Sequence, residues 1–122
     1  MTTSLADFRR GDTVRIKLTY PAGTNLAGFQ WWFTLKANMD DLDQDAVLQV
    51  HKQTDDYSGD NFAGGVAYIV LPAVLTGDVT PGKYHYDIQE KAASGEIRTL
   101  LPPLASANEK ISVITDVTRT TT

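Results

Sequence analysis

The chain of 122 residues contains no cysteine, and this absence excludes several kinds of site together. Without thiols there are no disulfide bonds, no thiolate nucleophile and no zinc–sulfur centre. Histidine is scarce as well: only His51 and His85 are present, so a metal site built from imidazoles is not expected. No apolar run approaches the ~20 residues that a membrane-spanning helix needs. We therefore expect no bound cofactor, no metal and no membrane contact.

An excess of positive charge is also missing. Lys and Arg number 11 and Asp and Glu number 15, which gives a formal net charge of −4. A field of this sign repels phosphate, so nucleic acid is not an expected partner. Gly64 and Gly65 precede an apolar run, but they lack the Lys-Ser/Thr pair and the helix that a phosphate-binding loop requires. The first ten residues hold no apolar segment after a basic start, so no signal peptide is predicted in them.

What the sequence does contain is alternation of apolar and polar residues with a period of two, the pattern of a half-buried strand. Ile16 and Leu18, for example, alternate with Arg15 and Lys17. Residues 65–71 are apolar throughout, which predicts a central strand covered on both faces. The predicted strands span residues 4–9, 13–20, 28–37, 46–53, 65–71, 83–91, 96–101 and 111–117.

The number of strands favours an all-β fold. Seven to eight short strands with turn signals between them are typical of a β-sandwich. Only residues 39–47 and 71–77 invite a helix, and we interpret both as loops with at most a single turn. The length suits one ordinary domain and is too short for two. We therefore predict one domain over residues 1–122, with short polar tails at both ends.

Nothing in the sequence points to catalysis. A catalytic triad needs a nucleophile beside a histidine, and no Gly-x-Ser-x-Gly motif is present. The five serines lie in polar loops or tails or late in a strand. We interpret His51 and His85 as structural or surface residues, predict that the protein is not an enzyme, and assign no catalytic residue.

An aspartate-rich stretch resembles the start of an EF-hand calcium loop. Asp41, Asp43 and Asp45 alternate as its first ligands do, but Ala46 replaces the turn glycine and Lys52 replaces the bidentate glutamate. We interpret the stretch as a solvated acidic rim without calcium. The alternative is a looser calcium site that adds one of three further aspartates, Asp55, Asp56 or Asp60.

Two adjacent tryptophans, Trp31 and Trp32, must point to opposite faces of a strand. One is expected in the core, while the other either marks a contact surface or is covered within the domain. The threonine-rich C-terminal segment is suited to adding a strand to a neighbouring molecule. The candidate interface residues are therefore Trp31, Trp32, Thr118 and Arg119.

Gly82, Tyr84 and Tyr86 are spaced like the Gly-x-Tyr-x-Cys motif of an immunoglobulin F strand, with tyrosine in place of cysteine. The chain thus resembles an immunoglobulin-like sandwich that packs apolar side chains where other members have a disulfide. The resemblance implies that Tyr84 is a corner tyrosine whose hydroxyl bonds back to the preceding loop. It also implies that Trp31 or Trp32 is the tryptophan of strand C, and that Gly82 and Tyr86 are structural.

A narrower resemblance covers nearly the whole chain. The order of its short motifs resembles the immunoglobulin-like N-terminal domain of bacteriophage baseplate upper proteins and related small phage virion proteins. The matching pieces are residues 8–13, 26–28, 64–65, 81–87, 95–100 and 114–119.

This resemblance implies a non-enzymatic structural protein of the tail or baseplate, located in the virion, that binds other virion proteins in many symmetric copies. One alternative is a head decoration or cement protein of the phage capsid. Another is a carbohydrate-binding β-sandwich, in which an exposed tryptophan and an acidic loop would form the sugar platform.

Overall fold

The computed structural model describes residues 7–38, 46–53, 57–101 and 110–115. These residues are mostly β: they form eight strands, one short helix and one 3₁₀ turn, and the all-β prediction is confirmed at this level. No helix among them has the length and hydropathy that crossing a bilayer requires. The elements are β1 (Phe8–Arg9), β2 (Val14–Thr19), β3 (Gln30–Lys36), β4 (Leu48–Lys52), η2 (Phe62–Gly64), β5 (Val66–Leu71), α1 (Ala73–Thr76), β6 (Gly82–Lys91), β7 (Ile97–Leu101) and β8 (Lys110–Ile114).

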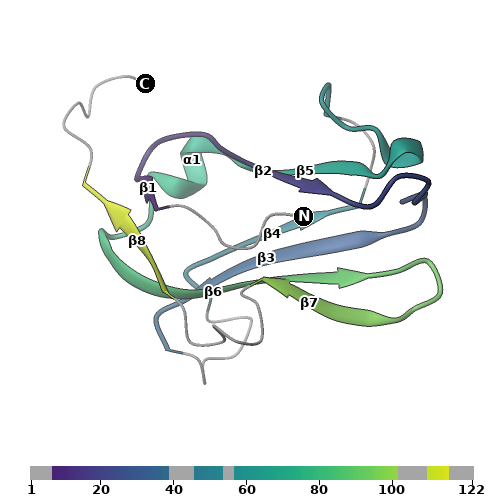
Figure 1. The fold of residues 1–122 in the computed structure, drawn as a ribbon. Helices are drawn as coiled ribbons and strands as arrows, with labels where there is room; N and C mark the ends of the chain where they lie inside the picture. Colours follow the sequence, from purple (N-terminus) through teal and green to yellow (C-terminus); the bar gives the residue numbers. More distant parts are fainter. Residues whose placement is uncertain (1–6, 39–45, 54–56, 102–109, 116–122) are drawn as a thin grey trace.

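The strands are arranged in two sheets (Figure 1). The larger sheet has the order β1-β8-β6-β3-β4, with β7 also paired to β6, and the smaller sheet pairs β2 with β5. All pairs are antiparallel except β1 with β8. In Figure 1, β2 and β5 lie above the curled larger sheet, with α1, β1 and β8 at one end and the β6–β7 turn at the other.

β7 and β8 share one edge of β6. β7 pairs with the C-terminal half of β6, from Ile88 to Lys91, and β8 pairs with the N-terminal half, from Gly82 to His85. β3 runs along the opposite edge of β6. The two short strands therefore act as two halves of one edge strand.

The core lies between the two sheets and consists of the apolar positions of the alternation together with Leu26, which comes from the segment between β2 and β3. Each fully buried large side chain contributes about 1.5–3 kcal/mol of hydrophobic stabilisation relative to an exposed one. The largest fully buried apolar side chains are Leu18, Leu26, Trp31, Phe33, Leu35, Ile69, Leu71, Ile88, Leu101 and Ile111.

The prediction that residues 65–71 form a central strand is wrong. Among the described strands β5 pairs only with β2, and only one of its faces is buried. The other face is half-buried because the preceding loop packs on it: the rings of Tyr57 and Tyr68 are 5.1 Å apart, and Asn61 forms a bridge to Val66. A loop rather than a second sheet therefore explains the apolar residues on that face.

Candidate functional site

Trp31 and Trp32 lie on opposite faces of β3, as the alternation predicted. Trp31 is fully buried, and its Nε1 donates a hydrogen bond of 3.0 Å to the hydroxyl of Tyr20. Trp32 is half-buried on the outer face of the larger sheet. Its ring stacks on that of His51, with centroids 4.6 Å apart and planes 5° apart. The predicted interface role therefore does not extend to Trp31, which offers no surface.

The outer face around Trp32 is otherwise polar. His51 Nε2 lies 2.9 Å from Gln30 Oε1, and Gln49 Nε2 donates to Thr34 Oγ1 at 3.1 Å. These cross-strand bonds between β3 and β4 hold the neighbouring side chains in place. The face thus presents one aromatic stack framed by amide groups, an arrangement suited to contacts with a partner.

The three residues that the sequence predicted to be structural, Gly82, Tyr84 and Tyr86, lie at the start and middle of β6. The hydroxyl of Tyr84 donates to the carbonyl oxygen of Thr80 in the preceding loop, so the predicted hydrogen bond is present. Tyr84 and Tyr86 are both buried, while Gly82 begins the strand and is exposed.

The two histidines do not form a site. His51 on β4 faces Trp32, whereas His85 on β6 pairs with Lys36 and Lys110, four residues further along β3. Within the part of the chain that the structure describes, no hydrogen bond joins either histidine to a serine.

Asp60, one candidate ligand of the looser calcium site, has a carboxylate that is already paired with three donors. Its fully buried carboxylate accepts from Lys52 Nζ at 2.5 Å, from the Tyr57 backbone N–H at 3.0 Å and from the Tyr68 backbone N–H at 2.8 Å. In the described ranges no group of three or more His, Asp or Glu side chains is placed to hold a metal. The other candidate calcium ligands lie outside the described residues: Asp41, Asp43, Asp45, Asp55 and Asp56. The candidate interface residues Thr118 and Arg119 also lie outside them.

Sequence reasoning missed a buried polar cluster around Glu90. This carboxylate faces the core from β6 and is fully buried. It accepts a hydrogen bond from the hydroxyl of Tyr20. Its Oε2 also accepts hydrogen bonds from Arg98 Nε at 3.0 Å and from Arg98 Nη2 at 2.8 Å. Because Tyr20 also accepts from Trp31, the cluster links β3, β6, β7 and the residue that follows β2.

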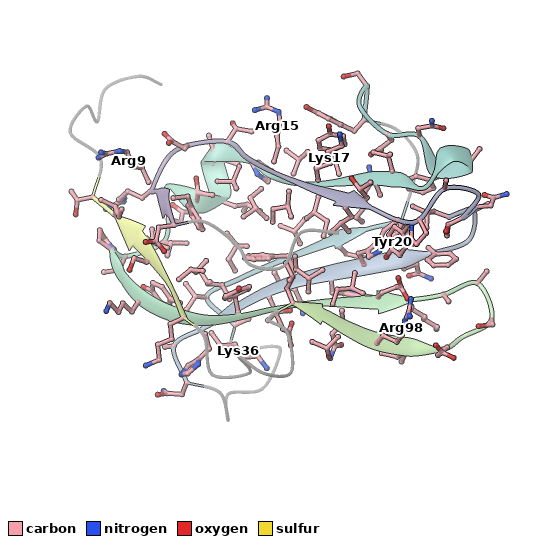
Figure 2. All side chains as sticks on the ribbon, viewed as in Figure 1. Arg9, Arg15, Lys17, Tyr20, Lys36 and Arg98 are labelled. Carbon is pink, nitrogen blue, oxygen red and sulfur yellow. The ribbon has the colours of Figure 1, made fainter. Side chains whose placement is uncertain are left out.

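The surroundings of the cluster determine its ionisation. Burial, followed by the hydrogen bond to Glu90, raises the pKa of Tyr20 above its ordinary value. The hydrogen bond to Glu90 and the charge of its carboxylate raise the pKa of Arg98. Figure 2 shows Tyr20 between the two sheets at the end of the molecule where Arg98 lies. The cluster therefore holds a neutral tyrosine and a charged arginine, and it joins the two sheets.

A groove of about 410 Å³ opens beside β4 and β5, the neighbouring strands of the two sheets. It is a second feature that the sequence did not reveal, because its walls come from three separate segments. The lining residues are Val50, His51, Lys52, Gln53, Tyr57, Tyr68 and Val70.

Neither a protein-family model nor a curated protein matches the chain. Among solved structures, the chain is similar to the crystal structure of an uncharacterized protein from Bacillus anthracis str. Ames. The two share 16% sequence identity with a TM-score of 0.47, over 93% of this chain and 80% of that one. A likeness at this level carries no argument about function.

Proposed function

We propose that the protein is a non-enzymatic structural component of a tailed-bacteriophage virion, in the tail or baseplate, that acts through protein–protein contacts. In this proposal the fold is an immunoglobulin-like sandwich. The strand order supports it, because β8, β6 and β3 correspond to strands G, F and C of such domains, β4 to C′, and β2 and β5 to B and E. The bond from Tyr84 to Thr80 adds the tyrosine corner.

The single observation that carries the proposal is the position of Trp32. A half-buried tryptophan on the outer face of a sheet supplies the aromatic anchor found at the centre of many interfaces. Stacking on His51 fixes the ring before any partner arrives, which lowers the entropy cost of association. The partners are other virion proteins in a symmetric, multi-copy assembly, with Thr118 and Arg119 as further contacts.

The test is incorporation into the particle. Trp32→Ala should keep the fold, judged by circular dichroism, and lose incorporation, because it removes the anchor from the outer face. Ile97→Ala, which truncates a 62% exposed side chain on β7, is the matched control and should incorporate normally. Deletion of residues 118–122 should also impair incorporation.

Normal incorporation of the Trp32→Ala variant and of the tail deletion would show that the contact surface lies elsewhere. Immunogold labelling of particles distinguishes the tail or baseplate from the alternative of a head decoration protein.

A further inference from the structure

The groove beside β4 and β5 is built around a buried charge that the proposed function does not use. Burying a carboxylate costs several kcal/mol unless it is fully paired. Asp60 is fully buried, and it is paired by one ammonium group and two backbone N–H groups. The two backbone donors belong to Tyr57 and Tyr68, so this carboxylate fixes the two residues whose rings line the groove.

The tyrosine rings themselves are held in place. Arg15 Nε donates to the hydroxyl of Tyr57 at 2.7 Å, and the two ring centroids lie 5.1 Å apart at an angle of 49°. A Cβ on Gly59 would lie 2.8 Å from Tyr68 Cε1 and 3.0 Å from Tyr57 Cε2. The absence of a side chain at Gly59 therefore leaves the space that both rings occupy.

The charge and lining of the groove define the class of ligand. Among the described lining residues Lys52 carries a full charge, and Asp60 compensates it at 2.5 Å. The remaining described walls combine aromatic rings and valines with two polar groups, the Gln53 amide and the His51 imidazole. A volume of about 410 Å³ lies within the range of small-molecule sites. Aromatic faces next to hydrogen-bond donors and acceptors match the C–H face and the hydroxyl groups of a sugar ring.

We propose that this groove binds a neutral saccharide. One sugar ring packs against Tyr57 and Tyr68, while Gln53 and His51 form hydrogen bonds with its hydroxyl groups. Asp60, Arg15 and Gly59 act as positioning residues that hold the rings. The site shares His51 with the Trp32 stack, but its aromatic walls, Tyr57 and Tyr68, lie on the seam between the sheets, so saccharide binding does not require the virion role.

The test is a titration of the ¹⁵N-labelled protein, followed by NMR, with maltohexaose, cellohexaose and N-acetylchitotetraose in turn. At least one of these should shift the amide signals of groove residues such as Gln53, Tyr57 and Tyr68. Tyr57→Ala should weaken binding by about tenfold, the loss expected for one stacked ring. Gly59→Ala should weaken it as well, although both tyrosines remain.

Two exposed glutamines provide the matched pair. Gln53→Ala should weaken saccharide binding, whereas Gln89→Ala should leave it unchanged, because Gln89 pairs with Trp32 on the outer face of β6 and is not a lining residue of the groove. The proposal is overturned if none of the three saccharides shifts the groove signals, or if the shifts gather around Trp32 instead. It is also overturned if Tyr57→Ala, Gly59→Ala and Gln53→Ala all bind as tightly as the parent. Because these measurements use the free protein, they are independent of particle incorporation.

Discussion

Among the residues that the structure describes, the carboxylates of Glu90 and Asp60 are both completely buried, and their partners differ in kind. Glu90 is bound by side chains, the Tyr20 hydroxyl and the Arg98 guanidinium, which come from separate parts of the two sheets. Asp60 is bound by two backbone N–H groups and one lysine, all from within residues 52–68. Side-chain partners let one carboxylate join distant strands, whereas backbone partners let the other shape a local turn.

The exposure of the two cations differs as well. The Arg98 side chain is 56% exposed, so water screens its attraction to Glu90, while the Lys52 side chain is only 10% exposed. The hydrogen bond from the buried Tyr20 hydroxyl therefore contributes more to the stabilisation of the Glu90 carboxylate than the ion pair with Arg98 alone would suggest. We expect its loss to affect the whole fold, and the loss of Asp60 to affect mainly the groove.

The largest effect is expected for Glu90→Ala. This change leaves the Tyr20 hydroxyl without its acceptor and removes the counter-charge of Arg98, so the free energy of unfolding should fall by about 3–5 kcal/mol in urea denaturation. Glu96→Ala is the control, since that carboxylate lies 3.8 Å from the same guanidinium but is 69% exposed. It should change stability by less than about 1 kcal/mol. Equal losses in the two variants would contradict the joining role of Glu90.

Asp60→Asn should have a smaller and more local effect. The amide keeps one acceptor oxygen for three donors and removes the charge that pairs with Lys52, so we expect a loss of about 2–3 kcal/mol. Amide NMR shifts should be concentrated near Tyr57 and Tyr68, and Asp78→Asn, at an exposed site, should be neutral. Shifts spread through β3 and β7 would remove the distinction between the two carboxylates.

The loss of one buried hydroxyl group gives a reference value for the stability losses predicted for Glu90→Ala and Asp60→Asn. Tyr84→Phe removes only the bond to the Thr80 carbonyl oxygen and should cost about 1–2 kcal/mol in the same denaturation assay, with the fold intact. Tyr57→Phe, whose hydroxyl accepts from an exposed arginine, should cost less. If Tyr84→Phe left the stability unchanged, one hydroxyl bond to the backbone could not serve as a reference for the stability losses at Glu90 and Asp60.

The smallest effect is on pH dependence. Because the pKa of Tyr20 is raised in the folded state, the folded protein keeps a proton that the unfolded chain loses above pH of about 10. The contribution of Tyr20 to the free energy of unfolding is therefore complete below that pH and declines above it. The decline is about 0.8 kcal/mol at a pH of about 10.5. Tyr20→Phe should lack this part of the decline when unfolding is compared between pH 8 and 10.5. An identical decline in both proteins would assign it to other groups.

The alternation in the sequence predicted where the strands lie, because one buried face imposes a period of two whatever the partner strand is. All eight observed strands lie within one residue of a predicted range. The alternation did not show which strands pair. β5 was predicted to be a central strand because it is apolar throughout, and an apolar run does not distinguish a covering loop from a covering sheet.

Glu90 did leave a signal. It has the same phase in β6 as Tyr84, Tyr86 and Ile88, so alternation places it in the core. The turn at Ser94 and Gly95 sets Arg98 opposite it, as the observed register has it. Asp60 left none, because its three donors come from β4, a loop and β5, and only the folded chain brings them together. The groove was unpredictable for the same reason.

The parallel pairing of β1 with β8 has a mechanical consequence. Phe8 pairs with Val113 and Arg9 with Ile114, and the Arg10 N–H adds a bond to the Ile114 carbonyl oxygen. Tension between the two ends of the chain pulls these strands in opposite directions along their length. Their hydrogen bonds are then loaded together in shear instead of opening one at a time. Sliding would also pull the buried ring of Phe8 out of the core, so this short contact resists stretching more strongly than its length indicates.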